Sequence, residues 1–516
     1  MNNFKTLCLT AAIASSSTAF AGGILTNTNQ NVAYNRMMSR EAAIGIDGVY
    51  YNPAGVAFMS EGHHLSLNWQ LAYQSRTIDN SYALFANNVN DPTTSRTFKG
   101  KAFAPVLPSF QYAYNKGKWS FQANFSLTGG GGKCTFDDGL GSFEKIVSET
   151  AMGATQLAAG VDQVAAAYGV PAIFTSDQAF GKTGSYSFNS YMHGRQYYYG
   201  LSLAAAYKVN EHFSAAVGVR GIYATCNYYG YVRDITVGNM PLYKVLDPSK
   251  TNAADIELNC DQSGIGFTPF FSFDVKTGRW NFAAKYELKT RIRLKNKSVN
   301  QAPSIGNLPE NLYNAYVANR VSEATAGAIL KNENVQSAMA SLKQQFDTKL
   351  AEAIGEYEDG KSISGDIPAL LTLGASYNPI DPLHINVGFH WFDDRHATAH
   401  NGRNRLLSHG TVEWTAGAEY DINKRFTISA GWQNTNYGLT DEYMDDKSFV
   451  ASSNSVAVGG AVRLSKRMKL NVAYFHTFYG HKTTEEQVDL GKTTLTYDSD
   501  YTRNNNVFAV GLDVDF

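Results

Sequence analysis

Charged side chains recur at every second position between residues 285 and 293. If this stretch is a β-strand, one of its faces carries Lys285, Glu287, Lys289, Arg291 and Arg293. A buried cation in such a cluster needs a partner, which is either the carboxylate of a ligand or a carboxylate of the protein itself. We expect Arg220, on another strand, to face the same enclosed space. The carboxylates that would complete an internal ion-pair network are Glu287, Asp274 and Glu419.

Histidines and catalytic motifs give no sign of an enzyme or a metal site. His63 and His64 are adjacent, so on a strand they point to opposite faces. His384 and His390 share a face, but at about 3.3 Å per residue they are about 20 Å apart, too far to share an ion. The sequence contains no G-x-S-x-G, H-E-x-x-H or paired C-x-x-C motif. We therefore expect no catalytic residues, no metal and no cofactor.

These residues lie on runs in which apolar and polar or small side chains alternate. In the last run, Phe508 and Val510 alternate with Ala509 and Gly511. A period of two residues predicts a strand with one apolar and one polar face. Fourteen such runs follow one another, at about 63–77, 103–115, 118–128, 186–208, 212–232, 255–276, 279–297, 366–378, 382–398, 406–421, 425–440, 449–465, 468–483 and 501–516.

The connections between these runs alternate between short and long. Every second one is a tight turn, such as 115–118 or 276–279, and the connections between them are longer. An even number of strands joined in this way is typical of an outer-membrane barrel, with its short turns on the periplasmic side. A β-sandwich with crossing connections would mix its loop lengths. We therefore predict an all-β fold, a closed 14-stranded antiparallel transmembrane β-barrel over residues 63–516.

Composition excludes several other classes of protein. Only 17% of the residues are charged, and 31 Tyr and 29 Phe are spread along the chain, which argues against a disordered protein. No segment after the N-terminal signal has about 18 consecutive apolar residues, so a helical membrane protein is excluded. The formal net charge of −1 gives no electrostatic reason to bind nucleic acid.

Residues 1–21 predict a secretory signal peptide. Lys5 supplies the positive start, an apolar stretch follows, and Ala19-Phe20-Ala21 is a small-x-small cleavage site. We therefore expect secretion through the inner membrane of a Gram-negative bacterium and a final location in its outer membrane. The mature chain keeps three cysteines, an odd number that leaves either one disulfide or three free thiols: Cys134, Cys226 and Cys260.

Two of the long connections carry apolar residues at helical spacing, in 142–170 and 309–358. By the count of turns and loops, both are extracellular. Their apolar stripes either pack against a neighbouring element or offer an apolar landing site for a ligand over the barrel mouth. We expect both loops to be partly helical.

Residues 22–62 precede the first strand and are too irregular to form a strand pair. Their apolar content predicts that they are buried, and a fourteen-stranded barrel encloses more space than its own side chains fill. The segment is therefore predicted to occupy the lumen. Its Asn52-Pro53-Ala54-Gly55 stretch is a turn, because Pro53 fixes its own φ, the Asn52 side chain can close on nearby backbone, and the last two residues are small.

The Asn52-Pro53-Ala54 motif, preceded by Glu41-Ala42-Ala43-Ile44-Gly45-Ile46-Asp47, resembles the FadL family of outer-membrane transporters for long-chain fatty acids and aromatic hydrocarbons. The resemblance continues in residues 367–379, 416–420 and 429–432 and covers most of the mature chain. The long loops match least, and the insert at 309–358 has no counterpart that can be aligned.

The resemblance implies that residues 22–62 form a hatch that plugs the barrel and rearranges when a ligand passes. Ligand would land on the outer loops and enter an apolar site, where Arg220 and Lys285 are the candidate partners of a fatty-acid carboxylate. Members of the family use a kink in the third strand as a side exit. Here that run ends in four glycines, residues 129–132, which we interpret as the start of a flexible loop.

The predicted function is passive, ligand-gated uptake of hydrophobic compounds. The alternatives are a general porin for small polar solutes and a non-transporting surface protein, such as an adhesin or phage receptor. We expect Asn52, Pro53, Ala54 and Gly55 to anchor the hatch and residues 22–48 to yield to ligand. The expected partners are the hydrophobic ligand, outer-membrane lipids and, during biogenesis, the barrel assembly machinery, with the protein acting as a monomer.

Overall fold

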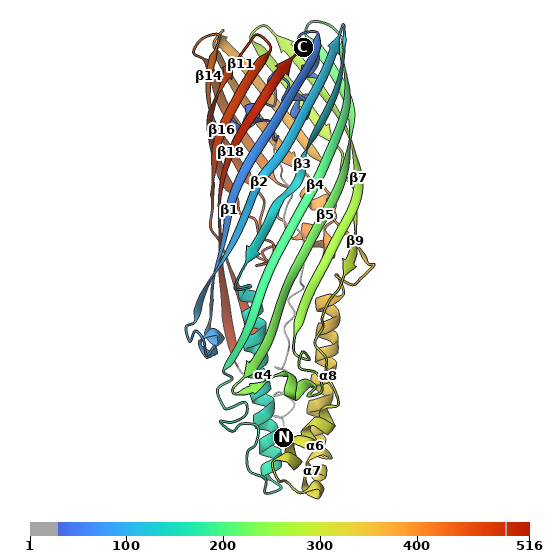
Figure 1. Ribbon diagram of the computed structural model, residues 1–516, viewed down its shortest axis with the longest axis vertical. Coiled ribbons are helices and arrows are strands. Elements are labelled where there is room, and N and C mark those ends of the chain that lie inside the picture. The colour runs from blue at the N-terminus through green and yellow to red at the C-terminus, as the bar shows by residue number, and fades with distance from the viewer. Residues whose placement is uncertain (1–28, 491–492) are drawn as a thin grey trace.

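The strands predicted from the alternating pattern form one closed sheet. The computed structural model describes residues 29–490 and 493–516. Strands pair antiparallel with their neighbours, and β1 pairs with β18, so the sheet closes on itself (Figure 1). The predicted signal peptide 1–21 and the start of the predicted hatch, 22–28, lie outside the described residues. The closed antiparallel barrel predicted from the sequence is therefore confirmed.

In the part of the chain that the structure describes, eighteen strands form the fourteen runs of the barrel wall. β8 and β9 are parts of one interrupted run, β10 and β11 are parts of the next, β17 extends β16, and β6 is a two-residue bridge to β5. The strands are β1 (Gly62–Tyr82), β2 (Ser95–Lys116), β3 (Trp119–Phe136), β4 (Tyr186–Lys208), β5 (Phe213–Val237), β6 (Met240–Pro241), β7 (Ile256–Thr277), β8 (Trp280–Glu287), β9 (Arg293–Ser298), β10 (Ser362–Ser364), β11 (Leu370–Ile380), β12 (Leu383–Phe392), β13 (Val412–Asp421), β14 (Phe426–Asn436), β15 (Ser453–Arg463), β16 (Met468–Tyr479), β17 (Lys482–Asp489) and β18 (Thr494–Asp515).

The two faces of the wall differ as the alternation predicted. On β3, Trp119 and Phe121 are exposed on the outside, whereas Ser120 and Gln122 are buried on the inside. An apolar outer band over a polar interior is the arrangement of a barrel whose outer surface contacts hydrocarbon. The three cysteines Cys134, Cys226 and Cys260 are free thiols, so the alternative without a disulfide holds.

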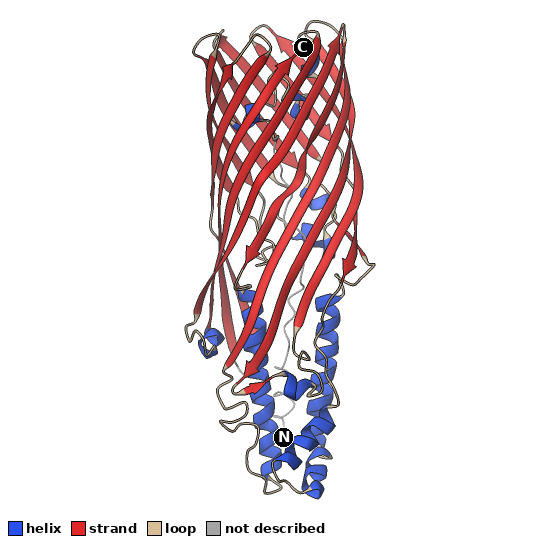
Figure 2. Cartoon of the chain, viewed as in Figure 1, coloured by secondary structure: helices blue, strands red, loops and turns tan. Residues whose placement is uncertain are grey.

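Short turns gather at one end of the barrel and long connections at the other (Figure 2). Gly117 and Gly278 occupy the β2–β3 and β7–β8 turns with φ of 59° and 57°. Glycine adopts this left-handed conformation without steric cost, which is why these turns need so few residues. The segregation of short turns from long loops agrees with the pattern read from the sequence.

The break between β8 and β9 reverses the direction of the charged side chains that were predicted to share a face. Lys285 on β8 points into the lumen and is buried, as predicted. Lys289 lies in the break, and beyond it Leu294 is buried while Arg291 and Arg293 are exposed on the outside. The prediction that Arg291 and Arg293 face the lumen is therefore wrong. An interruption of the two-residue period by one position exchanges the two faces of a strand.

The two long loops contain the predicted helices. Their bounds are α4 (Gly141–Ala166) between β3 and β4, and α6 (Leu308–Ala318), α7 (Glu323–Leu330) and α8 (Glu333–Ile354) between β9 and β10. Val161 and Ala165 of α4 pack with Tyr316 of α6 and Ile329 of α7. The apolar stripes therefore cover each other, in agreement with the packing interpretation.

Shorter helices occur in the remaining loops. They are η2 (Ala83–Asn87), α5 (Tyr243–Leu246), η3 (Asp394–His396) and η4 (His400–Leu406). Within residues 29–490 and 493–516, no helix combines the length and the apolar character needed to cross a membrane.

Residues 29–61, here called the lumenal segment, lie inside the barrel near the end with the short turns (Figure 2). The segment contains α2 (Val32–Asn35), α3 (Gly48–Tyr51) and η1 (Gly55–Phe58). Its side chains are buried almost throughout, including the large Tyr34 and Tyr51. Such short helices are not stable alone, so contacts with the wall must hold the segment in place.

Candidate functional site

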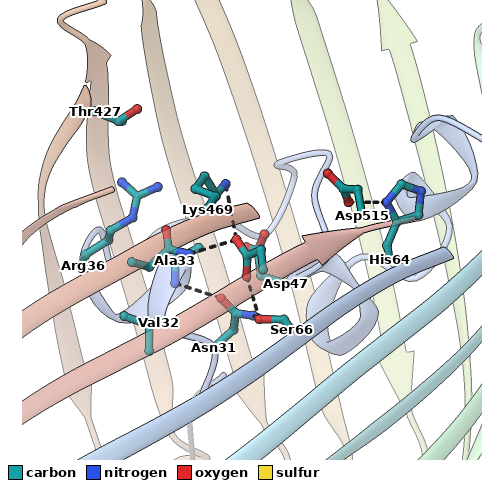
Figure 3. Close-up of polar contacts among 12 residues, drawn as sticks. Asn31, Val32, Ala33, Arg36, Asp47, His64, Ser66, Thr427, Lys469 and Asp515 are labelled. Atoms are coloured by element: carbon teal, nitrogen blue, oxygen red, sulfur yellow. Dashed lines mark hydrogen bonds and ion pairs between the residues drawn. The ribbon is translucent and has the colours of Figure 1, made fainter. Parts of the chain in front are cut away.

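Asn31 begins α2 and also binds the lumenal segment to the wall. Its side-chain oxygen accepts a hydrogen bond from the Ala33 N–H at 2.8 Å, the usual cap of a helix N-terminus. Its Nδ2 donates to Ser66 Oγ on β1 at 2.9 Å (Figure 3). It also donates to Gln111 Oε1 on β2 at 2.9 Å. One side chain thus fixes both the start of α2 and its position against the wall.

Two buried arginines of the lumenal segment share one carboxylate of the wall. Arg36 forms an ion pair with Glu419 on β13 and donates a hydrogen bond to Ser429 Oγ at 2.9 Å. Arg40 Nη1 lies 3.4 Å from the same carboxylate, and Arg40 Nε donates to Asp47 Oδ2 at 2.7 Å. Burial lowers the pKa of Arg36 and the adjacent Glu419 carboxylate raises it, so the ion pair offsets part of the cost of burying the guanidinium.

A buried histidine provides a second attachment. His390 Nε2 on β12 lies 3.2 Å from Glu41 Oε1 of the lumenal segment, and its Nδ1 lies 2.8 Å from Glu413 Oε2 on β13. Tyr51 stacks on the His390 ring with a centroid separation of 4.7 Å. The lumenal segment is therefore attached to β12 and β13 by imidazole–carboxylate contacts and by ring stacking.

The turn at Asn52-Pro53-Ala54-Gly55 has the internal hydrogen bond that its residue types predicted. Asn52 Oδ1 accepts from the Gly55 N–H at 3.0 Å, and Asn52 Nδ2 donates to Asp274 on β7. The Pro53 and Ala54 carbonyls accept hydrogen bonds, each at 2.7 Å, from side chains of β3 and β5, namely Gln122 and Ser214. The turn thus contacts three strands of the wall, and its role in gating stays a prediction.

The substitution Gly55→Ala is expected to loosen this turn. A Cβ at position 55 would lie 2.2 Å from Asn52 Nδ2 and 2.7 Å from Asp274 Oδ2, so the contact between these side chains must break or the turn must shift. Leaving buried polar groups unpaired costs about 1–3 kcal/mol. We expect faster amide hydrogen exchange over residues 48–58 and a small rise in ion leak across planar bilayers, with the barrel still folded in unboiled gels.

Gly327→Ala is the matched control, because a Cβ at this glycine of α7 meets nothing within 4 Å. Exchange and leak should equal those of the unchanged protein. If Gly55→Ala behaves like this control, the turn is only a connection into β1.

The two cations considered as carboxylate partners, Arg220 on β5 and Lys285 on β8, are both bound to Glu287. Arg220 Nη1 and Nη2 lie 2.7 and 3.0 Å from the two oxygens of Glu287. Lys285 Nζ donates to the same carboxylate and to a backbone carbonyl of α3. The other carboxylates considered for this network, Asp274 and Glu419, belong to the contacts described above. Arg220 and Lys285 are thus engaged by the protein itself, and neither lines the cavity described below.

The wall of the barrel has a gap between β2 and β3. The two strands pair at Ala102 with Cys134 and again at Phe110 with Phe125, but residues 103–109 and 126–133 do not pair with each other. β3 also carries two bulges against β4, at which Thr128 and Gly131 are the extra residues. The interpretation of residues 129–132 as the start of a flexible loop is therefore wrong, because β3 continues to residue 136.

Glycine makes this irregular part of β3 possible. Gly130 and Gly132 have φ of 75° and 143°, which residues with a Cβ rarely adopt. A Cβ at Gly130 would also lie 2.2 Å from the Gln196 carbonyl oxygen on β4. The four glycines therefore keep β3 paired with β4 while they release it from β2.

Gln30 of the lumenal segment takes the place of a strand partner beside the gap. Its carboxamide donates to the Leu127 carbonyl and accepts from the Leu127 N–H, both at 3.0 Å. The Gln30 carbonyl in turn accepts from Ser109 Oγ on β2 at 2.9 Å. Through these bonds Gln30 contacts the backbone of β3 and a side chain of β2 on the two sides of the gap. The lumenal segment and the gap are therefore linked through one residue.

A cavity of about 330 Å³ extends from the lumenal segment to this gap. Met38 lines it on the side of the lumenal segment, Leu107 and Leu127 line it on the two sides of the gap, and Phe449 lines it from the loop between β14 and β15. Its volume is at the small end of the range for ligand sites. The lining combines these apolar side chains with polar and charged ones, such as Gln74 and Arg76, and the cavity lies beside the break in the wall.

Sequence comparisons give no match, whether with protein-family models or with curated proteins. Solved structures do match. A Pseudomonas aeruginosa FadL homologue aligns with a TM-score of 0.60 and 14% identity over 96% of this chain and 100% of its own. The P. putida toluene transporter TodX aligns with a TM-score of 0.50 and 11% identity over 95% of this chain and 99% of its own. The chain therefore has the FadL-type fold that the sequence resemblance implied.

Proposed function

We propose that this chain is a FadL-type transporter that admits hydrophobic compounds through the outer membrane of a Gram-negative bacterium. The observation that carries the proposal is the cavity, which the lumenal segment borders on one side and the unpaired stretch of β2 and β3 borders on another. The description of TodX as a toluene transporter supports the same class of cargo.

Passage needs no energy source in this proposal. A hydrophobic compound leaves water for the apolar cavity, and the hydrocarbon of the bilayer outside the gap is a favourable next environment. Displacement of Gln30 by the compound removes the bonds to Leu127 and lets β3 move away from β2. The aqueous path along the barrel axis stays occupied by the lumenal segment, so ions and sugars do not follow.

The barrel also supports a monomeric protein, because β1 and β18 of the same chain complete the wall. Apart from the gap between β2 and β3, the described wall is completed within one chain and needs no strand from a second copy. We propose that the outward apolar side chains contact outer-membrane lipids directly.

Uptake and conductance together test this function. Cells that lack their own transporters for hydrophobic compounds should take up labelled decanoate or toluene when they express the protein, and planar bilayers should show little steady conductance. Large steady channels for salt and sugars would instead make the protein a porin. If the protein gives neither uptake nor conductance, it is a surface protein that does not transport.

A further inference from the structure

The charged side chains that point outward beyond the break after β8 form one row on the outer surface of the barrel. We call this row the basic strip, and all four of its side chains are exposed: Arg291, Arg293, Lys295 and Lys297. The residues between them, such as Leu294 and Asn296, are buried. Alternate residues of a strand lie about 7 Å apart, so the strip is about 20 Å long.

The protein itself does not neutralise the basic strip. Within the part of the chain that the structure describes, none of its four side chains forms an ion pair, whereas the preceding Lys289 lies 3.7 Å from Asp366. Asp261 of β7 is the cross-strand partner of Lys297, but it accepts a hydrogen bond from Asn227 Nδ2 at 2.9 Å. The middle of the strip therefore carries positive charge that no carboxylate of these strands balances.

Serine hydroxyls flank the middle of the strip on both sides. Lys295 is the cross-strand partner of Ser263 on β7 and of Ser362 on β10, and both serines are exposed. Arg293 pairs with Ser364 on β10 and donates a hydrogen bond from Nη1 to its Oγ. Guanidinium, ammonium and hydroxyl groups are the donors that bind phosphate oxygens. This combination predicts a phosphate rather than an apolar partner.

The strip begins where the apolar outer surface of the barrel ends. On β7 the outward side chains are apolar from Val275 to Ile265, and they are polar from Ser263 onward. Ten residues cover about 33 Å along a strand and about 25 Å of depth at the usual tilt, which is the height of the apolar band of an outer-membrane barrel. Lys295 pairs with Ser263, so the strip lies just beyond the hydrocarbon, on the side of the long loops (Figure 1).

The position of the strip identifies its partner as a lipid. The long loops of such a barrel are extracellular, so the strip lies at the head groups of the outer leaflet. In a Gram-negative outer membrane this leaflet is lipopolysaccharide, whose lipid A carries phosphates on an acylated disaccharide. Its acyl chains can lie along Ile265 and Phe267, which are 65% and 66% exposed beside the strip. A soluble anion would gain nothing from this apolar surface.

We propose that the basic strip and its flanking serines bind the phosphate groups of one lipid A molecule of lipopolysaccharide. The lipid is then held against β7, β9 and β10, with its acyl chains on the apolar band and its disaccharide along the strip. The proposal concerns the outer surface of the wall and does not depend on which compound passes through the barrel.

Binding of purified lipid A to the full-length barrel in a nonionic detergent, measured by native mass spectrometry, tests this proposal. The two probes are diphosphorylated lipid A and its monophosphorylated form with the same acyl chains. The unchanged protein should bind the diphosphorylated form about tenfold or more tightly. The double variant Arg293→Gln, Lys295→Gln should bind that form at least about tenfold more weakly and lose the preference between the two.

The matched control is Lys466→Gln, Arg467→Gln, which removes two exposed cations from the β15–β16 turn at the opposite end of the barrel. This control should bind both probes like the unchanged protein, and unboiled gels should show that both variants are folded. A preference for diphosphorylated lipid A that survives in Arg293→Gln, Lys295→Gln overturns the assignment of the strip. Equal binding of the two probes by the unchanged protein, or displacement of the lipid by an equal concentration of inorganic phosphate, overturns the proposed partner.

Discussion

Glu419→Gln is expected to free the lumenal segment from the wall while the barrel stays closed. The substitution removes the carboxylate that Arg36 and Arg40 share and leaves two buried guanidiniums with weaker partners. Breaking a buried ion pair by removing one partner costs about 3–5 kcal/mol. The strand ladder does not depend on this contact, so the loss falls on residues 29–61.

Two measurements report the released segment. Planar bilayers should show a steady ion conductance that the unchanged protein lacks, and amide hydrogen exchange over residues 32–47 should rise by about a hundredfold or more. Heat-resistant migration in unboiled gels should be retained. Glu485→Gln is the matched control, since this carboxylate is exposed on β17. If Glu419→Gln shows no added conductance and no faster exchange, then Asn31, His390 and the Asn52 turn hold the segment without the Glu419 carboxylate.

Deletion of Thr128 together with Gly131 is expected to close the gap in the wall. These are the two extra residues of β3 against β4, and removing both keeps every later side chain on its present face because the change is even. Six residues of β3 then lie opposite the seven residues 103–109 of β2, so the strands can pair across most of the stretch that is now unpaired. Uptake of decanoate or toluene should fall by at least about tenfold, which corresponds to a barrier higher by about 1.4 kcal/mol.

A binding measurement distinguishes a variant whose exit is closed from a variant whose binding site is damaged. The purified deletion variant should still bind the transported probe, since Met38 and the lining from β15 to β18 are unaltered. Thr128→Ala keeps the length of β3 and should transport at the normal rate. If the deletion variant is folded and transports normally, the compound leaves the barrel by another route.

Much of the architecture could be predicted because it follows from local patterns. The two-residue period located the strands, and the alternation of tight turns with long loops identified a closed barrel. The helical spacing in 142–170 and 309–358 marked α4 and the α6–α8 group. The residue types of Asn52 and Gly55 predicted the turn that they form.

The errors arise where the environment changes along one strand. Beyond the break after β8, the wall no longer has an apolar exterior, so Leu294 turns inward and Arg293 turns outward, the reverse of the rule that holds on β8. The glycines at 129–132 suit a loop start as well as a strand bulge, and only the register against β2 and β4 distinguishes the two. The glycine run indicates an irregular backbone, but whether that backbone is a loop or a bulged strand depends on the strands beside it.

The cavity could not be predicted from the sequence, because its charged side chains come from opposite ends of the chain. Arg76 and Arg503 become neighbours only when β1 pairs with β18. Gln30 contacts Leu127 only because the lumenal segment folds back into the barrel. Arg220 and Lys285 had the right charge and direction for a ligand, yet Glu287 lies close enough to occupy both.

The most direct test is a crystal structure of the full-length protein soaked with 10-bromodecanoate, in which anomalous scattering locates the bromine at the end of the tail. We predict one strong peak inside the barrel beside Met38, Leu107 and Leu127. A bromine found only among the long loops, or no peak within the barrel, would contradict passage of a hydrophobic compound through this cavity toward the gap.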